Sequence, residues 1–178
     1  MKKKLTLVLS LALAVAIGIG GTLAYLTART DPITNTFTIG NVGLTLAETT
    51  GTSYKMTPNT DISKDPVVTV TANSEKSYVF VKLTKGTNVD NYLEYSIDSS
   101  VWTALPEVEG VWYKVVDNST TDTRLNVLTN AKVHVRDTVS AIAAGDTVTL
   151  TFQAFAIQYD GIADVNTAWT TVSSAYTG

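Results

Sequence analysis

Hydrophobic and polar residues alternate in short segments along most of the chain, and helical periodicity is nearly absent after residue 24. Alternation places every second side chain on one face, which is typical of a strand with one buried side. The clearest alternations lie at 42–46, 68–72, 79–83, 93–97, 111–115, 133–135 and 148–156. Together with weaker segments they predict about eight short strands.

Turn-forming residues separate these segments, with Gly, Asn, Asp or Pro at 57–59, 64–66, 73–75, 98–100, 117–119, 144–146 and 160–161. Strands with one apolar face are not stable as a lone sheet in water, so they must pack as a sandwich or close as a barrel. No linker long enough to separate two domains interrupts them. The pattern favours an all-β fold with a single jelly-roll-type β-sandwich.

Two strands have apolar residues on both faces, at 78–81 and 154–157, so we expect them to be central in their sheets. The C-terminal segment differs, because Ile162, Val165, Trp169 and Val172 recur at helical spacing. This spacing predicts a short C-terminal helix within 162–176.

The N-terminus has the pattern of an export signal. Lys2 to Lys4 precede an apolar run from Leu5 to Gly20, and small residues lead to Thr22-Leu23-Ala24. We predict a signal helix, cleavage after Ala24 with Thr22 and Ala24 in the peptidase pocket, and Tyr25 as the first mature residue. The alternative is a retained membrane anchor, since 5–23 is about long enough to cross a bilayer. The predicted organisation is a signal peptide at 1–24, a flexible segment at 25–35 and a β-sandwich domain at 36–178.

Charge and composition exclude several classes of function. The chain carries 13 basic and 16 acidic residues, and loss of Lys2, Lys3 and Lys4 leaves a net charge of -6. No basic run remains that could neutralise nucleic acid phosphates or an anionic membrane surface, so we expect neither partner. Cysteine is absent, which excludes disulfides, thiolate metal sites and a cysteine nucleophile.

No residue pattern indicates a catalytic or metal site, so we expect neither an enzyme nor a bound cofactor. His134 is the only histidine, and it lies on the opposite face from Val133 and Val135. Zinc proteases need two histidines one helical turn apart, and no Gly-x-Ser-x-Gly elbow indicates a serine hydrolase. Glu107 and Glu109 could form a glycosidase pair, although Pro106 and Gly110 around them are more typical of an exposed loop.

Two other kinds of site are left open by the residue types. Loop oxygens could bind calcium, although neither candidate set has the twelve-residue pattern: Asp117, Asn118 and Asp122, or Asp160 and Asp164. Four aromatic residues could stack on a sugar or belong to the core: Trp102, Trp112, Tyr113 and Tyr159.

Several segments in a fixed order resemble one family. They are 20–27 (GGTLAYLT), 34–42 (TNTFTIGNV), 64–70 (KDPVVTV) leading to 78–82 (YVFVK), and 156–161 (AIQYDG) with Ala168-Trp169. With these segments in this order, the chain resembles the TasA and camelysin family. The members of that family are surface proteins of Gram-positive bacteria that are processed by the signal peptidase SipW.

The resemblance implies a jelly-roll domain that assembles into extracellular fibres of the biofilm matrix. Each subunit would donate its N-terminal segment as a strand to the next, here through Tyr25, Leu26 and Ile33. Its partners would be a SipW-like signal peptidase and other copies or homologous matrix subunits, and its location the extracellular matrix or cell surface. Pro32 limits the donor strand, because proline cannot donate a hydrogen bond to a sheet. It would contact a membrane only through the uncleaved signal.

Two further functions are alternatives to the structural one. Camelysin is described as a protease, so a secreted metallopeptidase is a second interpretation, although this sequence has no zinc motif. A surface binding module or adhesin for a glycan or a host protein is the third, with Trp102 or Trp112 as the contacting residues.

Overall fold

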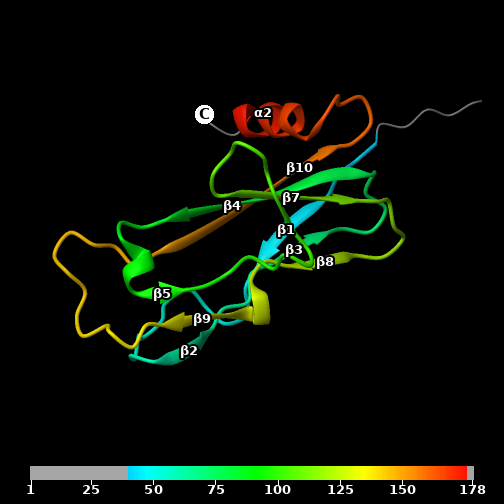
Figure 1. The fold of residues 1–178 in the computed structure, drawn as a ribbon. Helices are drawn as coiled ribbons and strands as arrows, with labels where there is room; N and C mark the ends of the chain where they lie inside the picture. Colours follow the sequence, from blue (N-terminus) through cyan, green and yellow to red (C-terminus); the bar gives the residue numbers. More distant parts are fainter. Residues whose placement is uncertain (1–39, 176–178) are drawn as a thin grey trace, which may run out of the picture. The chain divides into compact units, whose positions relative to one another are not determined.

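The computed structural model describes residues 40–175, which form antiparallel β-sheets and one short C-terminal helix (Figure 1). The elements are β1 (Leu44–Ala47), β2 (Thr60–Ser63), β3 (Val67–Val70), β4 (Ser77–Lys85), β5 (Leu93–Glu94), β6 (Thr103–Ala104), β7 (Val111–Val116), β8 (Thr123–Asn126), β9 (Lys132–Val135), β10 (Leu150–Gln158) and α2 (Val165–Ala175), with 3-10 turns at Val89–Asn91 and Thr129–Ala131.

Three sheets are present in this part of the chain. Their strand orders are β1-β3-β8, β10-β4-β7-β6 and β2-β9-β5, and all pairs are antiparallel. In the four-stranded sheet, Phe80 of β4 lies opposite Phe155 of β10 on one side and Tyr113 of β7 on the other. Strand β4 is therefore central, as its two apolar faces predict.

The two faces of the four-stranded sheet contact different layers. On one face, Val79 and Val81 pack against Val68 of β3 and Leu125 of β8, so this core lies between two sheets. On the other face, α2 lies across β4 and β10 (Figure 1), with the Trp169 ring 5.3 Å from Phe80. A third core, around the β2-β9-β5 sheet, includes Val133 and Val135.

Local sequence explains how the helix and several turns form. The backbone N–H of Thr167 donates to Oδ1 of Asp164 at 2.8 Å, which satisfies a free donor at the start of α2. Asn59 and Asn73 have φ of 56° and 61°, the left-handed conformation that asparagine tolerates in turns. The predicted C-terminal helix and the turns at these two residues are confirmed.

Three sequence predictions differ from the structure. The prediction that β10 is a central strand is wrong, because β10 lies at the end of its sheet in residues 40–175. Its second apolar face is covered by α2. The segment 93–97 pairs only at Leu93–Glu94 and through a single bridge at Ile97, and the alternation did not indicate β2, β6 or β8, which are two to four residues long.

The signal peptide and the 25–35 segment lie outside the described residues. Within 40–175, no helix is both long and apolar enough to span a membrane.

Candidate functional site

The outer edge of β10 has no strand beside it in the described region. Tyr159 N donates to Lys76 O and Gly86 N to Thr149 O, both at 2.8 Å, so the odd-numbered residues of β10 bond to β4. The main-chain groups of the even-numbered residues then point to the outer edge: Leu150, Phe152, Ala154, Ala156 and Gln158. Ten strong hydrogen-bonding groups are available there for another strand.

The composition of β10 does not protect this edge. Its nine residues, LTFQAFAIQ, contain no charge, no proline and no glycine. Monomeric β proteins usually shield a free edge with lysine, proline, a bulge or a very short strand. Here the edge is long, and Phe152, Ala154 and Ala156 are only half-buried although they pack against the first core. These features match a strand that accepts a partner.

Strand β1 lies along the same side of the domain as β10, with no backbone hydrogen bond between the two strands in residues 40–175. Thr71 N donates to Gly43 O at 3.0 Å, so Leu44 and Leu46 also direct their main-chain groups away from β3. Their side chains, like that of Phe152, are half-buried against the first core. The β1 and β10 edges therefore form a seam lined by apolar side chains. We call it the β1/β10 seam.

A buried ion pair lies at one end of this seam. Lys64 Nζ donates to both carboxylate oxygens of Glu48, at 2.8 and 3.1 Å, and the two side chains are 10% and 16% exposed. The same ammonium lies 5.5 Å from the centre of the Phe152 ring and 5.3 Å from that of Tyr54. The pair connects the end of β1 to β10.

A cavity with both polar and apolar lining residues continues from the start of β10. Its volume is about 460 Å³, and its lining includes Leu150 of β10 with Met56, Ile62 and Val148. Ile142 also lines this cavity and is 51% exposed. No other large hydrophobic side chain in residues 40–175 is as exposed. A strand added along β10 and running past Leu150 would reach this cavity.

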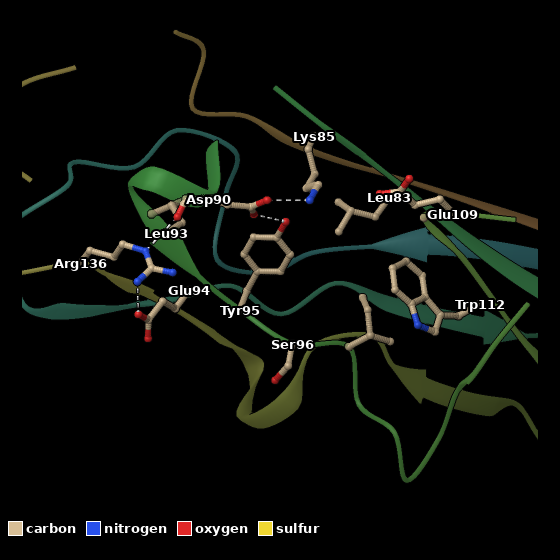
Figure 2. Close-up of a pocket in the computed structure, with 12 residues that line it drawn as sticks. Leu83, Lys85, Asp90, Leu93, Glu94, Tyr95, Ser96, Glu109, Trp112 and Arg136 are labelled. Atoms are coloured by element: carbon tan, nitrogen blue, oxygen red, sulfur yellow. Dashed lines mark hydrogen bonds and ion pairs between the residues drawn. The ribbon is translucent and has the colours of Figure 1, made fainter. Parts of the chain in front are cut away.

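A second pocket lies between the ends of β4 and β7 and the segment 93–97. It has a volume of about 550 Å³, and none of its lining residues belongs to β10. Figure 2 shows Trp112 and Leu83 at one end, with Glu109 beside them, and the ion-paired side chains toward the other end. We call it the Trp112 pocket.

Ion pairs order the charged end of the Trp112 pocket (Figure 2). Lys85 Nζ lies 2.7 Å from Oδ2 of Asp90, and the hydroxyl of Tyr95 donates to Oδ1 at 3.0 Å. Arg136 donates to Oε1 of Glu94 at 2.5 Å and, through Nε, to the main-chain oxygen of Asp90 at 2.8 Å. The hydrogen bond from Lys85 is the main cause that lowers the pKa of Asp90, while burial and then Asp90 raise the pKa of Tyr95.

Comparisons with family models, curated proteins and solved structures give no match for this chain.

The histidine considered from the sequence has a local partner, whereas the two glutamates are exposed side chains. His134 Nδ1 lies 2.8 Å from Oδ1 of Asp61 on the neighbouring strand, and the ring is 34% exposed. Hydrogen bonds from Lys132 and then His134 lower the pKa of Asp61. Glu107 and Glu109 are both exposed, and only Glu109 lines the Trp112 pocket.

The candidate calcium ligands take part in turns and caps. Asp122 accepts a hydrogen bond from Ala72 N at 2.9 Å, Asp117 pairs with Lys76 at 3.0 Å, and Asp164 caps α2. Across residues 40–175, no three His, Asp or Glu side chains are grouped so that they could hold a metal ion.

The four candidate aromatic residues occupy different environments. Trp102 is 3% exposed and donates its indole N–H to Asn126 O at 2.7 Å, so it belongs to the first core. Tyr113 and Tyr159 contact Phe80 and Tyr78 on the α2 face of the sheet. Trp112 lines the Trp112 pocket, which none of the other three does.

The predicted cleavage residues Thr22, Ala24 and Tyr25 and the predicted donor residues Tyr25, Leu26 and Ile33 lie outside the described residues. The structure therefore brings together residues that could accept a strand. Sequence reasoning missed β10 as an acceptor. The absence of charge and proline from 150–158 is the signal that could have indicated it.

Proposed function

We propose that this chain is a secreted structural protein of the extracellular or biofilm matrix, which polymerises into fibres or decorates them by strand donation. The donor is the 25–35 segment of one subunit, and the acceptor is the outer edge of β10 in the next. The domain is a jelly-roll-type β-sandwich in this proposal. The observation that carries it is the uncharged nine-residue edge of β10, whose outward main-chain groups have no partner in residues 40–175.

The physical basis is β-strand addition. An extended peptide gains main-chain hydrogen bonds along a free edge, and pockets for alternate side chains supply specificity. At about 3.3 Å per residue, the eleven residues of 25–35 are long enough to cover nine-residue β10. The β1/β10 seam and the cavity beside Leu150 provide apolar contacts for Tyr25, Leu26 and Ile33 of the donor.

Export controls assembly in this proposal. A SipW-like signal peptidase cleaves after Ala24, and the donor segment is tethered to the membrane until then. The partners are further copies of the chain or homologous matrix subunits, and the location is the matrix or the cell surface.

The first test compares two purified chains, one beginning at Tyr25 and one at Phe37, by electron microscopy and sedimentation at the same salt and pH. We expect filaments only from the longer chain. Filaments of equal length and number from the chain that lacks 25–36 would contradict donation by this segment, and two monomeric chains would contradict self-assembly.

A second test blocks the acceptor edge in the chain that begins at Tyr25. Ala154→Pro replaces an outward N–H with a ring carbon and removes no bond to β4. Ala104→Pro is the matched control at the opposite edge of the same sheet. Leu105 N donates to Val111 O, so Ala104 N also points away from its neighbour. We expect Ala154→Pro to abolish filaments and Ala104→Pro to leave them, with circular dichroism as the check on folding.

A surface binding module is the second candidate function. The observation that favours it is the Trp112 pocket, where an aromatic ring and ordered charged groups line one cavity.

A further inference from the structure

We propose that the Trp112 pocket binds an oligosaccharide of hexopyranose units that carry a free amino group. This inference is independent of strand donation, because the pocket shares no residue with β10. A fibre subunit with such a site would attach to a polysaccharide of its surroundings.

The apolar end of the pocket fits one face of a pyranose ring. Trp112 is half-buried, and Leu83 and Ile97 lie with it in the lining. Trp112 packs against the first core, and its indole N–H has no hydrogen-bond partner in residues 40–175. A ring that is apolar on its face and has a free donor at its edge suits a ligand with C–H groups on one side and hydroxyls around the rim.

The charged end of the pocket fits hydroxyl groups. Lys85 and Arg136 are each neutralised by a carboxylate, of Asp90 and Glu94, so they contribute directional donors with little net charge. An ammonium has three N–H groups and a guanidinium five, so both retain donors for a ligand. Sugar hydroxyls both donate and accept, and the carboxylates supply acceptors beside these donors.

Glu109 gives the pocket its preference for an amine. Two cations and three carboxylates line the cavity. Of these three carboxylates, Asp90 and Glu94 are ion-paired, and Glu109 has no ion pair within residues 40–175. The resulting charge of one negative unit disfavours phosphates and uronic acids. It favours a protonated amino group, which would form a charge-assisted hydrogen bond with Glu109.

The test uses isothermal titration calorimetry on the chain that begins at Tyr25, with three tetrasaccharides as probes. They are a glucosamine tetramer, its fully N-acetylated form and a glucose tetramer linked β-1,4. We expect the glucosamine tetramer to bind at least fivefold more tightly than the other two. Absence of binding for all three at millimolar concentration would overturn the proposal.

Two carboxylate variants form a matched pair. Glu109→Gln should weaken binding of the glucosamine tetramer at least fivefold and change binding of the glucose tetramer less than twofold. Glu107→Gln removes a charge two residues away, outside the pocket lining, and should change neither. Equal losses in the two variants would show attraction of a polycation to an acidic surface and would overturn the proposal.

Two further variants test the pocket itself. Trp112→Leu should reduce the affinity for every probe at least tenfold. Because Trp112 also packs against the first core, Ser96→Phe provides a second test: Ser96 is an exposed residue of the pocket lining, and a phenyl ring there should narrow the cavity. Wild-type affinity in a folded Ser96→Phe chain would overturn the proposal. Filament formation, measured on the same variants, should be unchanged, so loss of sugar binding and loss of assembly are distinguishable.

Discussion

The ion pair between Lys64 and Glu48 gives the most direct test of how the β1/β10 seam is stabilised. Lys64→Met keeps the length of the side chain and removes its charge. The carboxylate of Glu48, only 16% exposed, then has no other ion-pair partner in residues 40–175. Removing one partner from a fully buried pair costs about 3 to 5 kcal/mol. Since Glu48 keeps some contact with water, we expect the free energy of unfolding to fall by about 2 to 3 kcal/mol.

Replacing both residues should restore much of this loss. In Lys64→Met/Glu48→Leu the seam contains apolar groups of similar size, and such replacements are often neutral or stabilising. We therefore expect the double variant to be at least about 1 kcal/mol more stable than Lys64→Met. At about 2 to 4 °C per kcal/mol, the single variant should melt roughly 5 to 10 °C lower than the wild type.

Urea unfolding followed by tryptophan fluorescence measures the free energy of unfolding of both variants, provided that the slope of this free energy with urea concentration is unchanged. Lys132→Met is the control, because its pair with Asp61 is exposed, at 44% and 45%, and should contribute less than about 1 kcal/mol. A double variant less stable than Lys64→Met would refute the reasoning, since it would mean that no uncompensated charge had been left in the seam.

Three other substitutions have clear expected outcomes. Ser77 is fully buried and its hydroxyl has no partner in the described residues, so Ser77→Ala should leave stability unchanged or raise it by up to about 1 kcal/mol in urea unfolding; a loss above that amount would contradict it. Phe80→Ala removes a fully buried ring beside Trp169 and should cost about 3 to 5 kcal/mol by the same assay, and a loss below about 1 kcal/mol would show that the α2 face does not depend on this ring. Hydrogen bonds, first of all from the Thr49 hydroxyl, hold the pKa of Asp65 well below its usual value. A carboxyl with a lowered pKa stabilises the fold above its unfolded pKa of about 3.9, and this contribution is lost as the pH falls towards the folded pKa. The melting temperature should therefore be level from about pH 7 to 5 and fall below about pH 4, with a smaller fall in Asp65→Asn; identical acid profiles would refute this assignment.

The long elements could be predicted from the sequence because the spacing of their apolar residues follows which of their faces are buried. Strands β4 and β7 and helix α2 have apolar residues at the spacing of their buried sides, and all three lie where the pattern indicates. Strands β2, β6 and β8, with sequences TDIS, TA and TRLN, contain one apolar residue each, so they show no alternation. Their pairing depends on neighbours far along the chain.

The position of β10 shows what periodicity cannot convey. The side-chain pattern indicates whether the two faces of a strand are buried, whereas the neighbouring strands lie along its edges. Phe155 and Ile157 are covered by a helix, and Ala154 and Ala156 by the first core. The sequence pattern is then the same as for a strand with sheet on both sides, and the prediction of a central strand was wrong for this reason.

The Trp112 pocket could be predicted only in part. Trp112 and Glu109 could be considered from the sequence because they are an aromatic and an acidic residue near a turn. Lys85, Asp90 and Arg136 are ordinary charged residues in three separate segments. Their ion pairs arise from tertiary packing.

The pairing of β4 with β10 also determines the order in which the domain can form. Lys85 pairs with Leu150 and Ser77 with Gln158, so the partners are 65 and 81 residues apart in the chain. Strand β7 follows β4 much sooner and can pair with it first. While the chain emerges from a ribosome, one edge of β4 therefore remains unpaired until β10 of the same chain has been made, and contacts between distant residues form slowly. During that interval β10 of another molecule can take the same place, and the yield of correctly folded monomer should fall as chains become crowded.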